Sequence, residues 1–118
     1  MMDTQLVLNG FVKRVETYFP HKEIVSRTSA DKIHRLTYKD FATRTRKLAS
    51  ALEKIGMTKG MKVGSFAWNQ HRHLEAYFAV PCTGAVLHMI NIRLADEHLE
   101  YIINHAQDEI LLVDIDLF

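Results

Sequence analysis

Between residues 62 and 113, strand-like segments alternate regularly with segments of helical periodicity. Apolar, β-branched runs at 62–67, 85–90 and 110–113 predict strands, and amphipathic spacing at 70–80 and 96–106 predicts helices between them. Strands that alternate with helices of this length form parallel βαβ units with right-handed crossovers. We therefore expect an α/β fold built on a parallel βαβαβ sheet with flanking helices.

The residues that precede this pattern predict a short N-terminal helix and a β-hairpin. Helical spacing of apolar residues covers roughly 4–19, and strand candidates at 23–27 and 32–36 flank a polar turn. A long helix follows at 38–55, and Thr37 begins it with the sequence pattern of a capping box. No linker divides the 118 residues, so we expect residues 1–118 to belong to one domain.

Composition excludes several classes of function. Fifteen Lys and Arg against fourteen Asp and Glu provide no basic surface for nucleic acid, and no apolar run has membrane-spanning length. The single cysteine, Cys82, cannot form an internal disulfide and is expected to be a packed thiol. Residues 1–5 do not resemble a signal peptide, so we expect a cytoplasmic protein.

Polar residues follow each of the three predicted parallel strands, at 68–69, 91–93 and 114–116. Because ligands bind beyond the carboxyl ends of such strands, we expect Asn69, Asn91 and Arg93 to lie together at a binding site on this edge of the sheet. There they would orient the groups that contact the ligand without contacting it themselves. Ordinary structural roles remain open for all three. Asn69 would then cap a helix, Asn91 would form a turn, and Arg93 would make an ion pair.

The sequence offers no residue set for catalysis or for binding a metal or cofactor. The seven histidines lack the spacing of a zinc site, and we expect most to be solvated or satisfied locally. Gly60 and Gly64 enter a strand, whereas a phosphate-binding loop leaves a strand and opens a helix. Ser65 lacks a glycine-flanked elbow and is expected to pack. The final apolar strand suggests that the chain is the front part of something larger.

Three stretches together resemble the AMP-forming adenylating enzymes. "RLTYKDFATRTRKLASALEKIGMTKGMKVG" (35–64) is similar to their first core motif, and "AVPCTGAVLHMINIRLADEHLEYIINHAQDEILLVD" (79–114) to their second. "AWNQHRHLEAYFAVPCTGAVLHMINIRL" (67–94) most resembles the fatty acyl-CoA synthetase branch. One departure is Ala95-Asp96, where many members have Ser-Pro, so Asp96 is expected to cap the following helix.

The resemblance implies a parent ligase that activates a long- or medium-chain fatty acid. Such an enzyme uses ATP and Mg²⁺ to form an acyl-adenylate and then transfers the acyl group to coenzyme A. The motifs that bind these groups match no position here, so the resemblance implies that this chain alone binds none of them and is inactive. Residues 1–118 would be the N-terminal part of the adenylate-forming domain.

A second hypothesis is an independent, non-catalytic α/β module for interaction or dimerisation, because fold alone does not fix function. In the resembling enzymes, the outer neighbour of the apolar segment 110–113 comes from sequence not present here, so we expect this edge to be open in the isolated chain and to favour a homodimer or a larger species.

Overall fold

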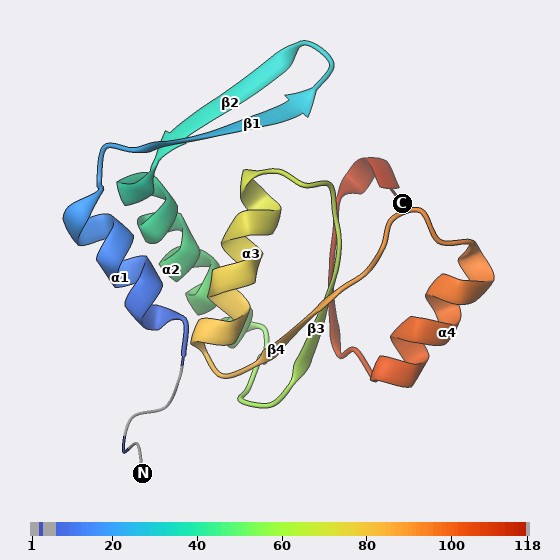
Figure 1. Cartoon of the computed structure of the whole chain (residues 1–118). Coiled ribbons are helices and arrows are strands. Elements are labelled where there is room, and N and C mark those ends of the chain that lie inside the picture. Colours follow the sequence, from blue (N-terminus) through green and yellow to red (C-terminus); the bar gives the residue numbers. More distant parts are fainter. Residues whose placement is uncertain (1–2, 4–6, 118) are drawn as a thin grey trace.

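The structure is a computed structural model, and it describes residue 3 and residues 7–117. A three-stranded parallel sheet stands at the centre of the chain, in the order β4-β3-β5 (Figure 1). The predicted α/β fold is confirmed. The elements in chain order are α1 (Asn9–Tyr18), β1 (Glu23–Ser29), β2 (Lys32–Thr37), α2 (Tyr38–Lys54), β3 (Lys62–Phe66), α3 (His71–Cys82), β4 (Val86–Met89), α4 (Asp96–Ala106), β5 (Ile110–Val113) and a short 3-10 helix, η1 (Ile115–Leu117).

The main core lies between the sheet and α2 and α3, which pack against each other. Val63 in β3 and Val80 in α3 are fully buried, and Leu52 of α2 joins them. Leu87 and Leu112, from the flanking strands, pack against the same cluster, so the sheet turns this face toward α2 and α3. Helix α4 lies on the other side of the sheet, and none of its residues is fully buried (Figure 1).

The capping box predicted for α2 is present. The Asp40 backbone N–H donates to Thr37 Oγ1 at 3.2 Å, and the Thr37 N–H donates back to Asp40 Oδ2 at 3.2 Å. Two backbone donors at the helix start are thereby satisfied. Gly56, just beyond the C-cap Ile55, has a φ of 111°, a conformation that glycine adopts without a steric penalty.

Strands β1 and β2 form the predicted antiparallel hairpin, which projects from the start of α2 (Figure 1). Both are slightly longer than the sequence indicated. Pairing of β1 continues past a bulge between Arg27 and Ser29, and β2 extends to Thr37, which pairs with Glu23. Helix α1 begins at Asn9, later than predicted, and the predicted portion at 4–6 lies outside the described residues.

The expectation that Asp96 caps α4 is wrong. Ala95 is the N-cap, and no side chain makes a capping hydrogen bond there. Asp96 instead lies inside the first turn with Glu97, where acidic side chains interact favourably with the helix dipole. Over residue 3 and residues 7–117, no helix has the length and apolar character needed to cross a bilayer.

Candidate functional site

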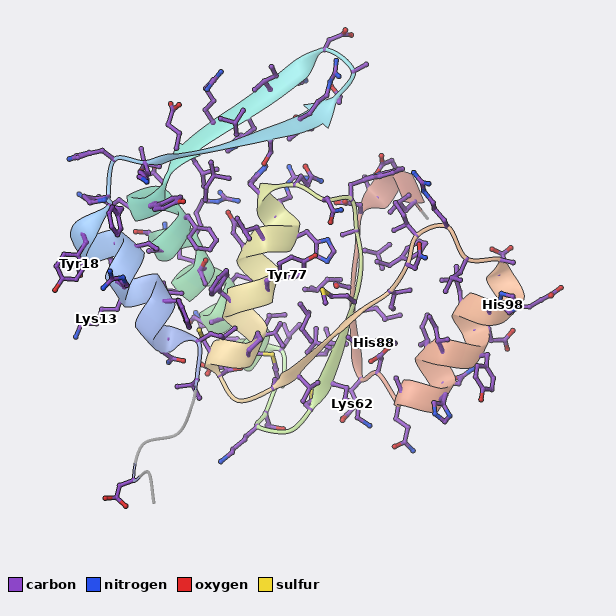
Figure 2. The ribbon with its side chains drawn as sticks, in the orientation of Figure 1. Lys13, Tyr18, Lys62, Tyr77, His88 and His98 are labelled. Carbon is purple, nitrogen blue, oxygen red and sulfur yellow. The ribbon has the colours of Figure 1, made fainter. Side chains whose placement is uncertain are left out.

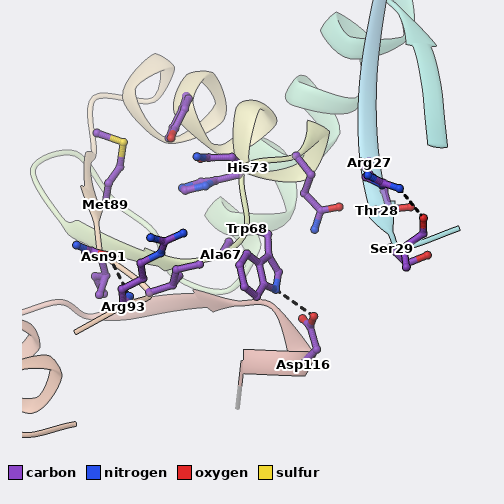
Figure 3. A pocket seen from close by; sticks show the side chains of 16 residues that line it. Arg27, Thr28, Ser29, Ala67, Trp68, His73, Met89, Asn91, Arg93 and Asp116 are labelled. Atoms are coloured by element: carbon purple, nitrogen blue, oxygen red, sulfur yellow. Dashed lines mark hydrogen bonds between the residues drawn. The ribbon is translucent and has the colours of Figure 1, made fainter. Parts of the chain in front are cut away.

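A cavity of about 950 Å³ lies at the carboxyl edge of the parallel sheet. The loops that follow β3 and β4 line it, together with Asp116 beyond β5. The tip of the hairpin, residues 27–30, forms a further wall (Figure 3). This is the edge at which open parallel sheets bind ligands, so the cavity is the candidate site.

Trp68 is held in this cavity by the chain that follows β5. Its backbone N–H donates to Asp114 Oδ2 at 2.8 Å, and its indole N–H donates to Asp116 Oδ2 at 3.0 Å (Figure 3). Gln70 Nε2 also donates to Asp114 Oδ2, at 3.1 Å. These bonds join two loops that are distant in sequence, so Trp68 is a fixed wall of the cavity.

The structure brings Asn69, Asn91 and Arg93 to this one cavity. The cap assignment for Asn69 is wrong, since Gln70 is the N-cap of α3 and makes no side-chain capping bond. Ser26 Oγ, from the hairpin, takes that role by accepting a hydrogen bond from the His71 N–H at 2.8 Å. Asn69 itself is exposed at the cavity rim.

Asn91 and Arg93 form one local unit. The Arg93 backbone N–H donates to Asn91 Oδ1 at 3.0 Å, which is the geometry of an Asx turn and matches the turn-forming role considered for Asn91. Within the described part of the chain, no carboxylate lies within 4.0 Å of the Arg93 guanidinium, so the ion pair considered for Arg93 is not observed. The turn therefore places at the cavity an exposed cation that forms no ion pair with the described residues.

A buried serine–histidine pair lies beneath the cavity and was missed by sequence reasoning. Ser65 Oγ and His73 Nε2 are 2.9 Å apart, and the two residues are 1% and 6% exposed. Burial lowers the pKa of His73, and the Trp68 carbonyl and the Asp114 carboxylate oppose that effect only partly. The expectation that Ser65 packs in the strand holds. At 1% exposure, the Ser65 side chain has almost no contact with solvent.

A second histidine contact fastens the hairpin to α3. The rings of His34 and His71 stack with centroids 3.9 Å apart and planes 10° from parallel. His71 is buried, and desolvation, with a smaller effect of the His34 charge, lowers its pKa. The expectation that most histidines are solvated or satisfied locally is therefore wrong for His34, His71, His73 and His88, each of which contacts a residue outside its own helix or strand.

The described residues do not assemble a metal or phosphate site. Nowhere in residue 3 or residues 7–117 do three or more His, Cys, Asp or Glu side chains come together. Gly60 and Gly84 have positive φ angles, but they lie before β3 and β4, at the amino edge of the sheet. There the Gly60 N–H donates to the Gly84 carbonyl, so these glycines connect two turns rather than cradle an anion.

Comparison with known proteins gives consistent matches. The AMP-binding enzyme family profile matches residues 12–117. The chain is 45% identical over 117 residues to a long-chain-fatty-acid–CoA ligase of Thermus thermophilus, covering 99% of this chain and 22% of that protein. A medium-chain-fatty-acid–CoA ligase of Ectopseudomonas oleovorans is 43% identical over 114 residues, covering 97% of this chain and 21% of that protein. The chain thus spans about a fifth of the length of these relatives.

Among solved structures, a putative long-chain-fatty-acid CoA ligase from Rhodopseudomonas palustris superposes with a TM-score of 0.83. The match covers 94% of this chain and 27% of that one at 24% identity, which establishes a shared fold.

Proposed function

Because this chain belongs to the AMP-binding enzyme family, we propose that residues 1–118 form the N-terminal part of a domain that activates a fatty acid. That domain joins the fatty acid to AMP at the expense of ATP, releasing pyrophosphate, and then transfers the acyl group to coenzyme A. The observation that carries the proposal is the close identity, over almost the whole chain, to ligases named for long- and medium-chain fatty acids. No observation favours the alternative of an independent interaction module.

The described residues offer no site for Mg²⁺ or for the phosphates of ATP, since they include no metal-binding cluster and their glycine turns lie at the sheet edge opposite the cavity. We therefore assign no catalytic step to this chain and derive none through those groups. We propose that the chain contributes the carboxyl edge of the parallel sheet, which forms one side of the site.

Within that domain, we infer that Asn69, Asn91 and Arg93 support the acyl-adenylate pocket without touching the reacting atoms. The Asx turn of Asn91 fixes the backbone at Arg93, and the guanidinium faces the cavity with no carboxylate partner in the described chain. A charge held in this way can orient neighbouring groups that do contact substrate.

A cytoplasmic location and self-association complete the proposal. The single half-buried thiol of Cys82 suits a reducing compartment, and the edge of β5, which no strand of the described residues covers, suits pairing of the isolated chain with a second copy.

A chimera tests the proposed function. Residues 7–117 would replace the matching segment of the Thermus thermophilus ligase, and acyl-CoA formation would be measured over a series of fatty acids. We expect activity with long- or medium-chain acids, since the segment would restore the same scaffold. A chimera that folds, by circular dichroism, but forms no acyl-CoA with any acid would contradict the proposal.

Arg93→Ala in that chimera tests the supporting role. We expect acyl-adenylate formation to fall by about tenfold to a hundredfold, because small displacements at a distance from the chemistry carry penalties of that size. Lys32→Ala, at an exposed site on the hairpin, is the matched control and should leave the rate unchanged. If Arg93→Ala lowers the melting temperature as well as the rate, the role of Arg93 is structural. If the rate is unchanged, Arg93 does not support the site.

A further inference from the structure

The loop that carries Trp68 is closed at its base by a buried hydrogen bond. Ser65 lies near the end of β3, before this loop, and His73 lies in the first turn of α3, after it. Ser65 Oγ and His73 Nε2 are 2.9 Å apart, and both residues are buried. The bond therefore joins the two ends of the segment from which Trp68 and Asn69 reach the cavity (Figure 3).

Ser65 also holds the neighbouring loop. Its backbone carbonyl accepts a hydrogen bond from the Ile90 N–H at 2.9 Å, and the turn of Asn91 and Arg93 begins at the next residue. The side chain and the main chain of Ser65 thus connect to the loops that follow β3 and β4. A displacement of Ser65 would therefore move two walls of the cavity.

The orientation of the His73 ring depends on Ser65. The Trp68 carbonyl lies near enough to the ring to affect its pKa, but no hydrogen bond of acceptable geometry joins Nδ1 to any described residue. The ring also contacts that of Tyr77, with centroids 4.6 Å apart and planes 49° from parallel. Tyr77 lines the same cavity, and Figure 2 shows it on the side of α3 turned toward β3. The Ser65 hydroxyl is thus the hydrogen-bond partner that fixes this ring.

The hydrogen bonds at the tip of the loop hold it less firmly than the bond at its base. The Trp68 N–H groups donate to Asp114 and Asp116 at exposed positions, where water competes for the same donors and acceptors. The bond between Ser65 and His73 is shielded from water, which strengthens it, and its loss would leave a buried nitrogen unpaired. The position of the loop is therefore set mainly from its buried end.

We propose that His73, fixed by Ser65, is a positioning residue for acyl-adenylate formation. It holds Trp68 and Asn69 in place at the cavity and acts through their loop, without touching the reacting atoms. The inference rests on the proposed function for the reaction that it serves, whereas the effect of His73 on the loop can be tested on this chain alone.

Trp68 is the only tryptophan of the 118 residues, so the anisotropy decay of tryptophan fluorescence measures how freely this loop moves. We expect a larger fast component in Ser65→Ala and in His73→Leu, because each change removes the bond at the base. His73→Gln should resemble the unaltered chain, since the glutamine amide can donate from the position of Nε2. Thr45→Ala, which removes a buried hydroxyl without a hydrogen-bond partner from α2, is the matched control and should change nothing.

The same variants in the chimera with the Thermus thermophilus ligase measure the effect on the reaction. We expect acyl-adenylate formation to fall by about tenfold to a hundredfold in Ser65→Ala and His73→Leu, because a small misplacement of a site wall carries a penalty of that size. His73→Gln and Thr45→Ala should retain most of the rate. Rates are compared at a temperature at which circular dichroism shows every variant to be folded.

An unchanged anisotropy decay in both Ser65→Ala and His73→Leu would overturn the inference. So would a lowered melting temperature with an unchanged rate, which would make the pair purely structural, or a His73→Gln variant as impaired as His73→Leu. If Ser65→Ala does not fold, the comparison of His73→Leu with His73→Gln decides the question. An unaltered chimera without activity would instead contradict the proposed function, and the anisotropy decay would still show whether His73 positions the loop.

Discussion

The buried imidazole of His71 makes the stability of the chain depend on pH. Burial, and next the charge on His34, lower the pKa of His71 below its ordinary value of 6.5, while Glu75 acts in the opposite sense and Arg44 and Arg72 reinforce the shift. Below pH 6.5 the unfolded chain therefore binds a proton that the folded chain resists. The stabilising contribution of neutral His71 is fully present above pH 6.5 and is lost as the pH falls toward its lowered pKa. His73, whose pKa is also lowered, contributes in the same direction.

Urea unfolding at about pH 7.5 and about pH 5.5 measures this dependence, since the two values bracket an ordinary histidine pKa. We expect a lower free energy of unfolding at the acidic pH and a smaller difference in His71→Phe, which keeps a ring at the stack but cannot be protonated. His98→Phe, at an exposed position on α4, should retain the full difference. The same pH dependence in His71→Phe and in the unaltered chain would show that another group is responsible.

Gly64 lies where an added Cβ would force neighbouring side chains to shift. A Cβ at this position would approach Leu111 Cδ2 to 2.5 Å, Asp108 Oδ2 to 3.0 Å and Ile90 Cδ1 to 3.1 Å. We expect Gly64→Ala to destabilise the chain by about 1–3 kcal/mol, the typical penalty for overpacking. Gly10→Ala is the matched control, because it has no atom within 4 Å and lies in α1, where alanine is favoured by up to about 1 kcal/mol. Thermal unfolding of both variants should show shifts of opposite sign. A stabilised Gly64→Ala would disprove the close approach.

Sequence reasoning placed Asn69, Asn91 and Arg93 at one sheet edge because the carboxyl ends of parallel strands must coincide there. It could not find the contacts between Ser65 and His73 or between His34 and His71. Ser65 and His73 are 8 residues apart in sequence, and His34 and His71 are 37 apart. Only the packing of α3 against β3 and the hairpin brings each pair together. No periodicity or motif marks a histidine that will be buried by a distant segment.

Helices α2 and α4 differ in how their N-termini are capped, so single substitutions at the two N-caps should change stability in opposite directions. Helix α2 has a capping box at Thr37, whereas α4 begins after Ala95 with no side-chain cap. Thr37→Ala should cost about 1 kcal/mol, and Ala95→Ser should gain a few tenths to about 1 kcal/mol by supplying an acceptor for a free N–H. Denaturant unfolding of the two variants measures both changes. No loss in Thr37→Ala would mean that the reciprocal bonds contribute nothing net.

The regular elements were predictable, and their ends less so. Strands β3, β4 and β5 match the predicted segments to within a residue or so, because apolar runs bounded by glycine or polar turns leave few alternatives. The predicted range of α4, 96–106, is confirmed, but the N-caps of α3 and α4 were misassigned to Asn69 and Asp96. Several polar residues near a helix start compete for the cap. The part that the hairpin plays in the cavity was also unforeseen, because α2 separates the hairpin from the sheet in sequence.

The arrangement of the sheet as a whole predicts association. Within the described residues, β5 pairs with β3 and has no strand on its other side, and its Val113 is 40% exposed. Unpaired strand edges attract partners by backbone pairing. We expect light scattering at high concentration to give a mass above the 13.6 kDa of one chain.

Substitution at that edge distinguishes its role from a general tendency to aggregate. Val113→Lys should return the chain to a monomer, because a charged side chain discourages edge pairing. Tyr101→Lys, which adds the same charge on α4, should not. A monomer before any substitution, or association that Val113→Lys leaves intact, would exclude β5 as the contact.

We propose that this chain is the scaffold of a fatty-acid-activating site and that its described residues supply none of the catalytic groups. Fatty-acid-dependent release of pyrophosphate from ATP, measured for the isolated 118-residue chain beside the active chimera and a protein-free blank, tests that description most directly. We expect release from the chimera and none above the blank from the isolated chain. Turnover by the isolated chain would contradict the account, because it would reveal a nucleotide site among residues to which we assign only support.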